Sequence, residues 1–136
     1  MNIDLMTQEL TRDEGKRNKV YLDSRGIATI GIGRNVRDLG LSDDECAYLL
    51  KNDIARVSAE LDHQLPWWRD MTENRQRALT NLCFNLGINR LLMFVNTLVA
   101  MKEGRYDDAA TGMENSVWAK QVGARATRLQ KMMREG

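Results

Sequence analysis

The chain has 136 residues, of which 43% are hydrophobic and 29% are charged, a composition typical of one globular domain and not of a disordered chain. Its 20 lysines and arginines against 19 acidic residues leave a net charge of +1, which does not favour a nucleic-acid partner. The 2 cysteines and 1 histidine are too few for a disulfide framework or a zinc site, so we expect no metal and no cofactor.

Residues 1–13 predict an amphipathic helix, because the apolar side chains recur with helical spacing. This N-terminus lacks a charged start followed by a long apolar core, and no apolar run in the chain approaches the length of a membrane span. We therefore expect a protein with no signal peptide and no membrane span, and a monomer as the default state.

Residues 13–33 supply two carboxylates and a hydroxyl. Glu14 stands where the first helix should end, Asp23 opens a turn, and Thr29 follows in the returning strand. Two carboxyl groups can cleave a glycosidic bond, one by protonating the leaving oxygen and the other by activating water. The helix dipole favours the protonated form of Glu14, whereas Asp23 in an open turn can stay ionised. Each feature alone is equally typical of a solvated helix end, a simple turn or an ordinary strand, and only their order indicates a site.

A long helix is predicted over residues 43–63. Ser42-Asp43-Asp44-Glu45 is a capping box with acidic residues in the first turn, and the helix should end by about His63 because Pro66 cannot continue it. Such a helix could join a small sheet lobe to a helical lobe.

The rest of the chain predicts further helices. Pro66-Trp67-Trp68 favours a short helical turn whose two tryptophans cover the edge of the core, and a helix that restarts near Thr72 should end at Gly87. Three more helices are predicted over Leu91–Lys102, Tyr106–Met113 and Ala124–Glu135. Several helices and one hairpin indicate an α+β fold that is mostly helical.

The segments Asp13-Glu14-Gly15, Tyr21-Leu22-Asp23-Ser24-Arg25-Gly26 and Ala28-Thr29-Ile30-Gly31-Ile32-Gly33 closely resemble the catalytic region of the phage-type lysozymes, glycoside hydrolase family 24. The resemblance implies that Glu14 is the general acid, that Asp23 is the carboxylate facing it, and that Thr29 is the partner of the nucleophilic water. Arg34 departs from the family, which often has His there, and the short segment 34–41 indicates a trimmed sheet lobe.

The resemblance continues through residues 77–87, 94–98 and 116–128. It implies one lysozyme-like domain over residues 1–136, in which the sheet lobe covers about 15–41, the linking helix about 43–63, and the helical lobe 1–13 plus 64–136. The residues expected to bind substrate are Gly33, Phe84, Asn85 and Thr97, with Arg125 and Arg128 in supporting roles. Arg125 could pair with Glu14 or Asp13 if the last helix packs near the first.

The resemblance leads us to expect an endolysin or muramidase that hydrolyses the β-1,4 bond between N-acetylmuramic acid and N-acetylglucosamine in peptidoglycan glycan strands. Two alternatives stay open: a lytic transglycosylase, and a non-catalytic cell-wall-binding or tail module. We expect synthesis in the cytoplasm of a bacterial host and release to the periplasm and cell wall at lysis.

Overall fold

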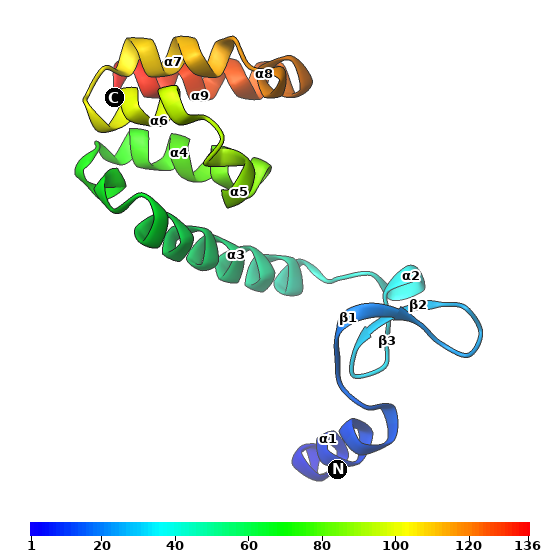
Figure 1. The fold of residues 1–136 in the computed structure, drawn as a ribbon. Helices are drawn as coiled ribbons and strands as arrows, with labels where there is room; N and C mark the ends of the chain where they lie inside the picture. Colours follow the sequence, from blue (N-terminus) through cyan, green and yellow to red (C-terminus); the bar gives the residue numbers. More distant parts are fainter. The chain divides into compact units, whose positions relative to one another are not determined.

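The computed structural model describes residues 1–136, and 71% of them are helical, with one small antiparallel sheet (Figure 1). This is the α+β, mostly helical fold predicted from the sequence. The chain divides into two units, Met1–Tyr48 and Leu49–Gly136, which are described separately below. The expected assignment of residues 1–13 to the helical lobe concerns the arrangement of the two units and stays a prediction.

The first unit begins with helix α1, Ile3–Glu14, close to the predicted range. Asn2 caps the helix, because its side-chain oxygen accepts the N–H of Leu5 at 3.0 Å. At the other end, the N–H of Gly15 donates to the carbonyl of Thr11, and the helix stops directly after Glu14. None of the helix residues is buried within the structure.

The sheet contains β1 (Arg17–Leu22), β2 (Ala28–Gly31) and β3 (Arg34–Asn35), paired antiparallel in chain order. The β1–β2 hairpin was predicted, whereas the two-residue β3 and the following four-residue helix α2, Val36–Leu39, were not. They form because Asn35 ends β3 and caps α2, accepting the N–H of Asp38 at 3.0 Å. The trimmed segment is therefore folded.

Arg34, the departure from the family pattern, connects β3 to the long helix α3, Asp43–Gln64. Its guanidinium donates to both carboxylate oxygens of Glu45, at 3.0 and 2.6 Å, and to the carbonyl of Gly40 at 3.3 Å. Glu45 also completes the predicted capping box, since it accepts the N–H of Ser42 at 2.9 Å while Ser42 Oγ accepts the N–H of Glu45 at 3.2 Å. These contacts hold the segment between β3 and α3.

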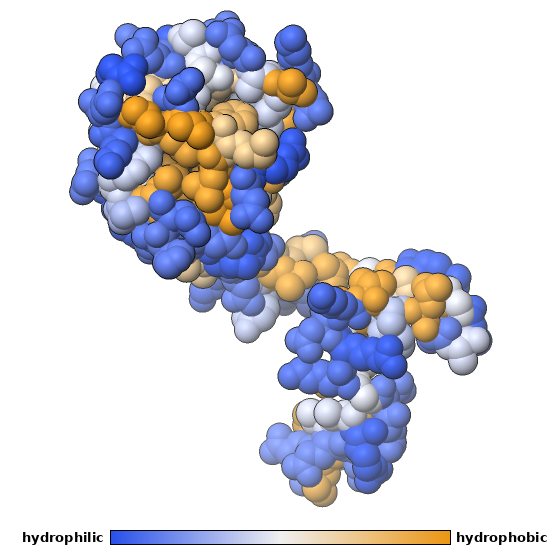
Figure 2. All heavy atoms as spheres, viewed as in Figure 1, coloured by the Kyte–Doolittle hydropathy of each residue, from blue (hydrophilic) through white to orange (hydrophobic).

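Helix α3 begins at the predicted capping box and ends one residue beyond His63. Only Val57 and Leu61 of this helix are buried, both in its second half. Several apolar side chains along it are exposed, and Figure 2 shows them as an apolar surface; they include Leu49, Leu50 and Ile54. No helix in the chain combines the length and apolar character that a membrane crossing requires.

The second unit is a helical bundle. Helix α7 packs against α6 and α9, and α4 packs against α9, so that these four helices enclose the core (Figure 1). The largest fully buried side chains include Leu79, Leu82, Met101, Met113 and Met133. The elements are the 3-10 helix η1, Pro66–Asp70, and the helices α4, Glu73–Leu86; α5, Ile88–Leu91; α6, Val95–Lys102; α7, Tyr106–Glu114; α8, Val117–Val122; and α9, Ala124–Glu135.

Trp67 and Trp68 lie in η1 and cover the core, as expected. Trp68 is buried and donates from Nε1 to Asp62 at 2.7 Å, while Trp67 is half-buried against the core. The predicted helix Leu91–Lys102 was wrong at its first turn, because α5 ends at Leu91 and α6 starts at Val95. No glycine or proline marks this break. It is made by packing, with Leu91 fully buried and the N–H of Phe94 turned back onto the carbonyl of Leu91 at 3.0 Å.

The contact between α6 and α7 generates a stability prediction. A methyl group added at Gly112 would collide with Oγ1 of Thr97, which is buried between the two helices. We expect Gly112→Ala to destabilise the protein by about 1–3 kcal/mol, because overpacking outweighs the better helix propensity of alanine. Urea unfolding would measure the loss, and Thr97→Ala in the same chain should restore most of it. Equal stability of Gly112→Ala and the wild type would contradict the prediction.

Candidate active site

Glu14 is the last residue of α1, and its exposed carboxylate lies against Gly33, in the turn between β2 and β3. A Cβ atom built on Gly33 would stand 2.7 Å from Oε2 of Glu14 and 3.0 Å from its Cγ. Gly33 belongs to the turn between β2 and β3 and has a φ of 68°, a conformation that glycine adopts readily. The missing side chain therefore makes room for the carboxylate.

Asp23 follows β1 and is held by the backbone of the turn that it opens. Its Oδ1 accepts the N–H of Arg25 at 2.8 Å and the N–H of Ile27 at 2.9 Å. The hydrogen bond from Ile27 contributes most to lowering the pKa of Asp23 below its ordinary value of 3.8, and the positive charges of Arg25 and Arg37 add to it. This carboxylate is therefore ionised at neutral pH, as the sequence led us to expect.

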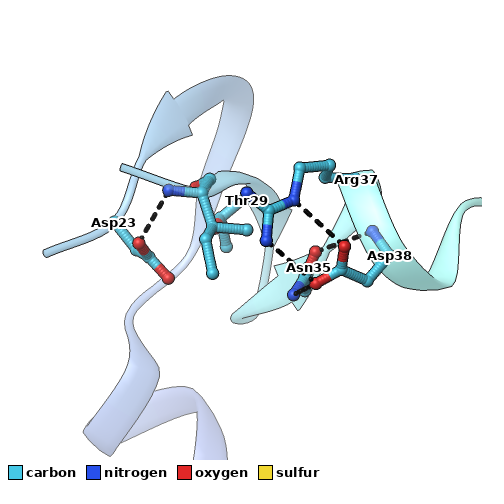
Figure 3. Close-up of polar contacts among 6 residues, drawn as sticks. Asp23, Thr29, Asn35, Arg37 and Asp38 are labelled. Carbon is cyan, nitrogen blue, oxygen red and sulfur yellow. Dashed lines mark hydrogen bonds and ion pairs between the residues drawn. The ribbon is translucent and has the colours of Figure 1, made fainter. Parts of the chain in front are cut away.

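Thr29 lies in the centre of β2, opposite Tyr21 of β1 and Asn35 of β3, and is only 4% exposed. Its hydroxyl donates to the carbonyl of Ile27 at 2.8 Å, and the same carbonyl accepts the N–H of Asp23 at 3.0 Å. Asp23 and Thr29 are thus both hydrogen-bonded to the backbone of Ile27, and they lie near each other (Figure 3). Because the Thr29 hydroxyl donates its proton to the Ile27 carbonyl, its oxygen can act only as an acceptor toward a water molecule.

Three further polar residues surround this pair. Asn35 donates from Nδ2 to Asp38 at 2.9 Å, and Arg37 donates to the two carboxylate oxygens of Asp38 at 3.0 and 3.3 Å. None of these three residues was singled out from the sequence. The spacing Asn-x-x-Asp in Asn35–Asp38 could have indicated them, because it is typical of a helix N-cap. An N-cap at Asn35 brings the three side chains close together.

The other residues expected to bind substrate lie in the second unit. Phe84 is 43% exposed and lines a groove of about 560 Å³ together with Leu50, Ile54 and Arg125. Asn85 accepts from Trp118 Nε1 at 2.6 Å, which uses its side-chain oxygen within the bundle and leaves its amide nitrogen as a donor. These contacts describe the residues but do not test a role in substrate binding.

Thr97, also expected to bind substrate, is 8% exposed and packed against Gly112. Arg125 donates from Nε to Oδ1 of Asn81 at 2.8 Å, and Arg128 is exposed on α9. A pair between Arg125 and Glu14 would connect the two units and stays a prediction. The structure therefore brings together Asp23 and Thr29, places Glu14 on Gly33, and gathers Phe84 and Arg125 at one groove.

Comparison with known proteins relates these residues to a family. A family described as phage lysozyme matches residues 11–134. The chain is 29% identical to the pre-baseplate central spike protein of Enterobacteria phage T4, over 96% of this chain but only 28% of that protein. It is 27% identical to the probable T4-type lysozyme 1 of Dictyostelium discoideum, over 93% of this chain and 92% of the relative. It is 34% identical to the endolysin of Salmonella phage P22, over 57% of this chain and 58% of the relative.

The contact between Gly33 and Glu14 generates a prediction for activity on peptidoglycan, the substrate that the sequence resemblance implies. We expect Gly33→Ala to displace the Glu14 carboxylate and to lower turnover by about 100-fold, since small misplacements of a reacting group are that costly. The matched control is Gly31→Ala, because Gly31 has nearly the same φ, 69°, but a Cβ there meets nothing within 4 Å. Both variants carry a backbone strain of about 1–2 kcal/mol. Equal activities would show that the contact with Glu14 does not matter.

The lowered pKa of Asp23 generates a prediction for stability. The charge of a carboxyl group whose pKa is lowered on folding stabilises the protein at pH values above its ordinary pKa of 3.8, and this contribution is lost as the pH falls through the lower pKa of the folded state. We therefore expect Asp23→Asn to lower the unfolding temperature at pH 7, with a deficit that shrinks as the pH falls below the ordinary pKa of 3.8. Calorimetry across this range would measure it, with the exposed Asp70→Asn as control. A deficit that is independent of pH would contradict the explanation.

Proposed function

Because this chain belongs to the phage lysozyme family, we propose that it is a muramidase that cleaves the β-1,4 bond between N-acetylmuramic acid and N-acetylglucosamine in peptidoglycan. Family membership supports a cell-wall hydrolase of the muramidase type. One observation supports the proposed roles of Asp23 and Thr29. Both side chains are hydrogen-bonded to the backbone of Ile27, which keeps an ionised carboxylate near a hydroxyl oxygen. Such a pair is suited to holding a water molecule.

The proposed mechanism divides the chemistry between two carboxyl groups. Glu14 donates a proton to the glycosidic oxygen, and Asp23 with Thr29 positions water for attack on the anomeric carbon. In an inverting reaction the carboxyl groups stand about 6.5–9.5 Å apart to admit the water, and in a retaining reaction about 5–5.5 Å. The anomeric configuration of the first product distinguishes the two courses.

The two alternatives make different products. A lytic transglycosylase would use Glu14 alone and leave anhydro sugar ends, whereas hydrolysis leaves reducing ends. The other alternative is a non-catalytic cell-wall-binding or tail module; the similarity to the T4 baseplate spike protein, of which this chain spans 28%, relates the chain to a tail component and not to a loss of catalysis. Such a module would bind peptidoglycan without shortening it.

The proposal extends to partner and place of action. The partner is the peptidoglycan glycan strand, which the protein cleaves as a monomer. It is made in the cytoplasm of a bacterial host and meets the cell wall when the cell lyses. Similarity to a phage endolysin supports this sequence of events.

We expect Glu14→Gln to abolish turnover while leaving the fold intact, because glutamine keeps the volume and polarity of the exposed side chain but cannot deliver a proton. Purified peptidoglycan treated with the wild type and the variant would be followed by loss of turbidity and by mass spectrometry of the soluble products. Circular dichroism of both proteins controls for folding.

The outcomes separate the three functions. Clearing by the wild type alone, with reducing muramic acid ends, supports a muramidase that uses Glu14. Anhydro ends would favour transglycosylation instead. Binding to peptidoglycan without any clearing by the folded wild type would favour the tail module, and near-normal activity of Glu14→Gln would overturn the assignment of the acid.

A further inference from the structure

A short chain of hydrogen bonds orients the side chain of Arg37. Asn35 holds Asp38 through its side-chain amide at 2.9 Å and through the N–H of Asp38 at 3.0 Å. Asp38 in turn accepts from Nε and Nη2 of Arg37 at 3.0 and 3.3 Å. The guanidinium is thereby fixed along one edge, although the Arg37 side chain remains 58% exposed.

This guanidinium lies beside the proposed catalytic pair. Asn35 is the register partner of Thr29 in the sheet, so the segment that carries Arg37 leaves the sheet next to Thr29. Figure 3 shows the guanidinium between Thr29 and Asp38. Its charge acts on Asp23, whose pKa is lowered mainly by the hydrogen bond from Ile27 and further by Arg25 and Arg37.

The edge of the guanidinium away from Asp38 is available to a ligand. An arginine carries five N–H donors, and the structure gives Nη1 of Arg37 no hydrogen bond. Nη1 and the second hydrogen of Nη2 form a planar pair of donors, which matches the two oxygens of a carboxylate. Asp38 already occupies the opposite edge and keeps this pair pointing in one direction.

We propose that Arg37 is a substrate-binding residue that recognises a carboxylate of the peptide stem on the muramic acid next to the scissile bond. The inference rests on the proposed function, since it takes peptidoglycan as the substrate. The stem is attached to the muramic acid ring through its lactyl group and carries free carboxylates. Asn35 pairs with Thr29 in the sheet and α2, which carries Arg37, follows directly, so we expect the stem of a muramic acid ring held beside Asp23 and Thr29 to pass near Arg37.

The test compares two forms of one soluble, uncrosslinked peptidoglycan. The first form is native, and in the second the carboxylates are converted to neutral amides with a carbodiimide and ethanolamine. We expect Arg37→Gln to raise KM for the native form about tenfold with kcat within about twofold, because a charged bidentate contact is lost but the reacting groups are untouched. On the amidated form, wild type and variant should have the same KM.

The controls separate recognition from charge and folding. Arg56→Gln removes a positive charge that is equally exposed, 58%, and paired with two acidic residues on α3, so it should leave both KM values unchanged. Arg37→Lys keeps the charge without the planar pair of donors and should raise KM less than Arg37→Gln does. Thermal unfolding of each variant checks that the fold is intact.

The outcomes distinguish this inference from the proposed function. Wild type that releases no sugar ends from either form would overturn the proposed function and this inference with it. Normal turnover by the wild type, combined with an unchanged KM in Arg37→Gln or an equal change on both forms, would overturn the role of Arg37 alone. A fall in kcat without a change in KM would also overturn it.

Discussion

The peptide backbone of Ile27 is the interaction on which the candidate site depends. Its N–H donates to the Asp23 carboxylate, and its carbonyl accepts from both the Asp23 backbone and the Thr29 hydroxyl. Ile27 itself is 6% exposed, so these hydrogen bonds are anchored in the most buried part of the first unit. The proposed catalytic pair is held by backbone atoms, so it is positioned before any substrate binds, and such preorganisation would reduce the reorganisation needed during the proposed reaction.

Side-chain contacts also connect the last strand of the sheet, β3, to the start of α3. Arg34 and Glu45 tie the end of β3 to the first turn of α3, and the Asn35–Asp38 contacts fold the intervening segment. The short segment between sheet and helix is therefore ordered by side-chain contacts. The contacts of Asp38 also orient Arg37, so the side chains that shape this segment place a cation beside the candidate site. Exposed pairs of this kind contribute little to stability, and their importance here is positional.

Local sequence signals were sufficient to predict helix ends that are set by a capping or helix-breaking residue at that position. The capping box predicted the start of α3, Pro66 its end, and Gly87 the end of α4, because caps and breakers determine backbone hydrogen bonds within one turn. The break between α5 and α6 carries no such residue and was missed, since the burial of Leu91 decides it. The contact between Thr97 and Gly112 was missed for the same reason.

The sequence by itself determined most of the helices, the β1–β2 hairpin, the α+β class and the resemblance that names Glu14, Asp23 and Thr29, because these depend on residue type and spacing. The tertiary structure decided which of these groups share a partner. It placed Asp23 and Thr29 on Ile27, Glu14 against Gly33, and Asn35, at the start of the segment that carries Arg37, opposite Thr29. The physical reason is that a strand pairing brings together residues that spacing alone leaves apart, as it does for Thr29 and Asn35.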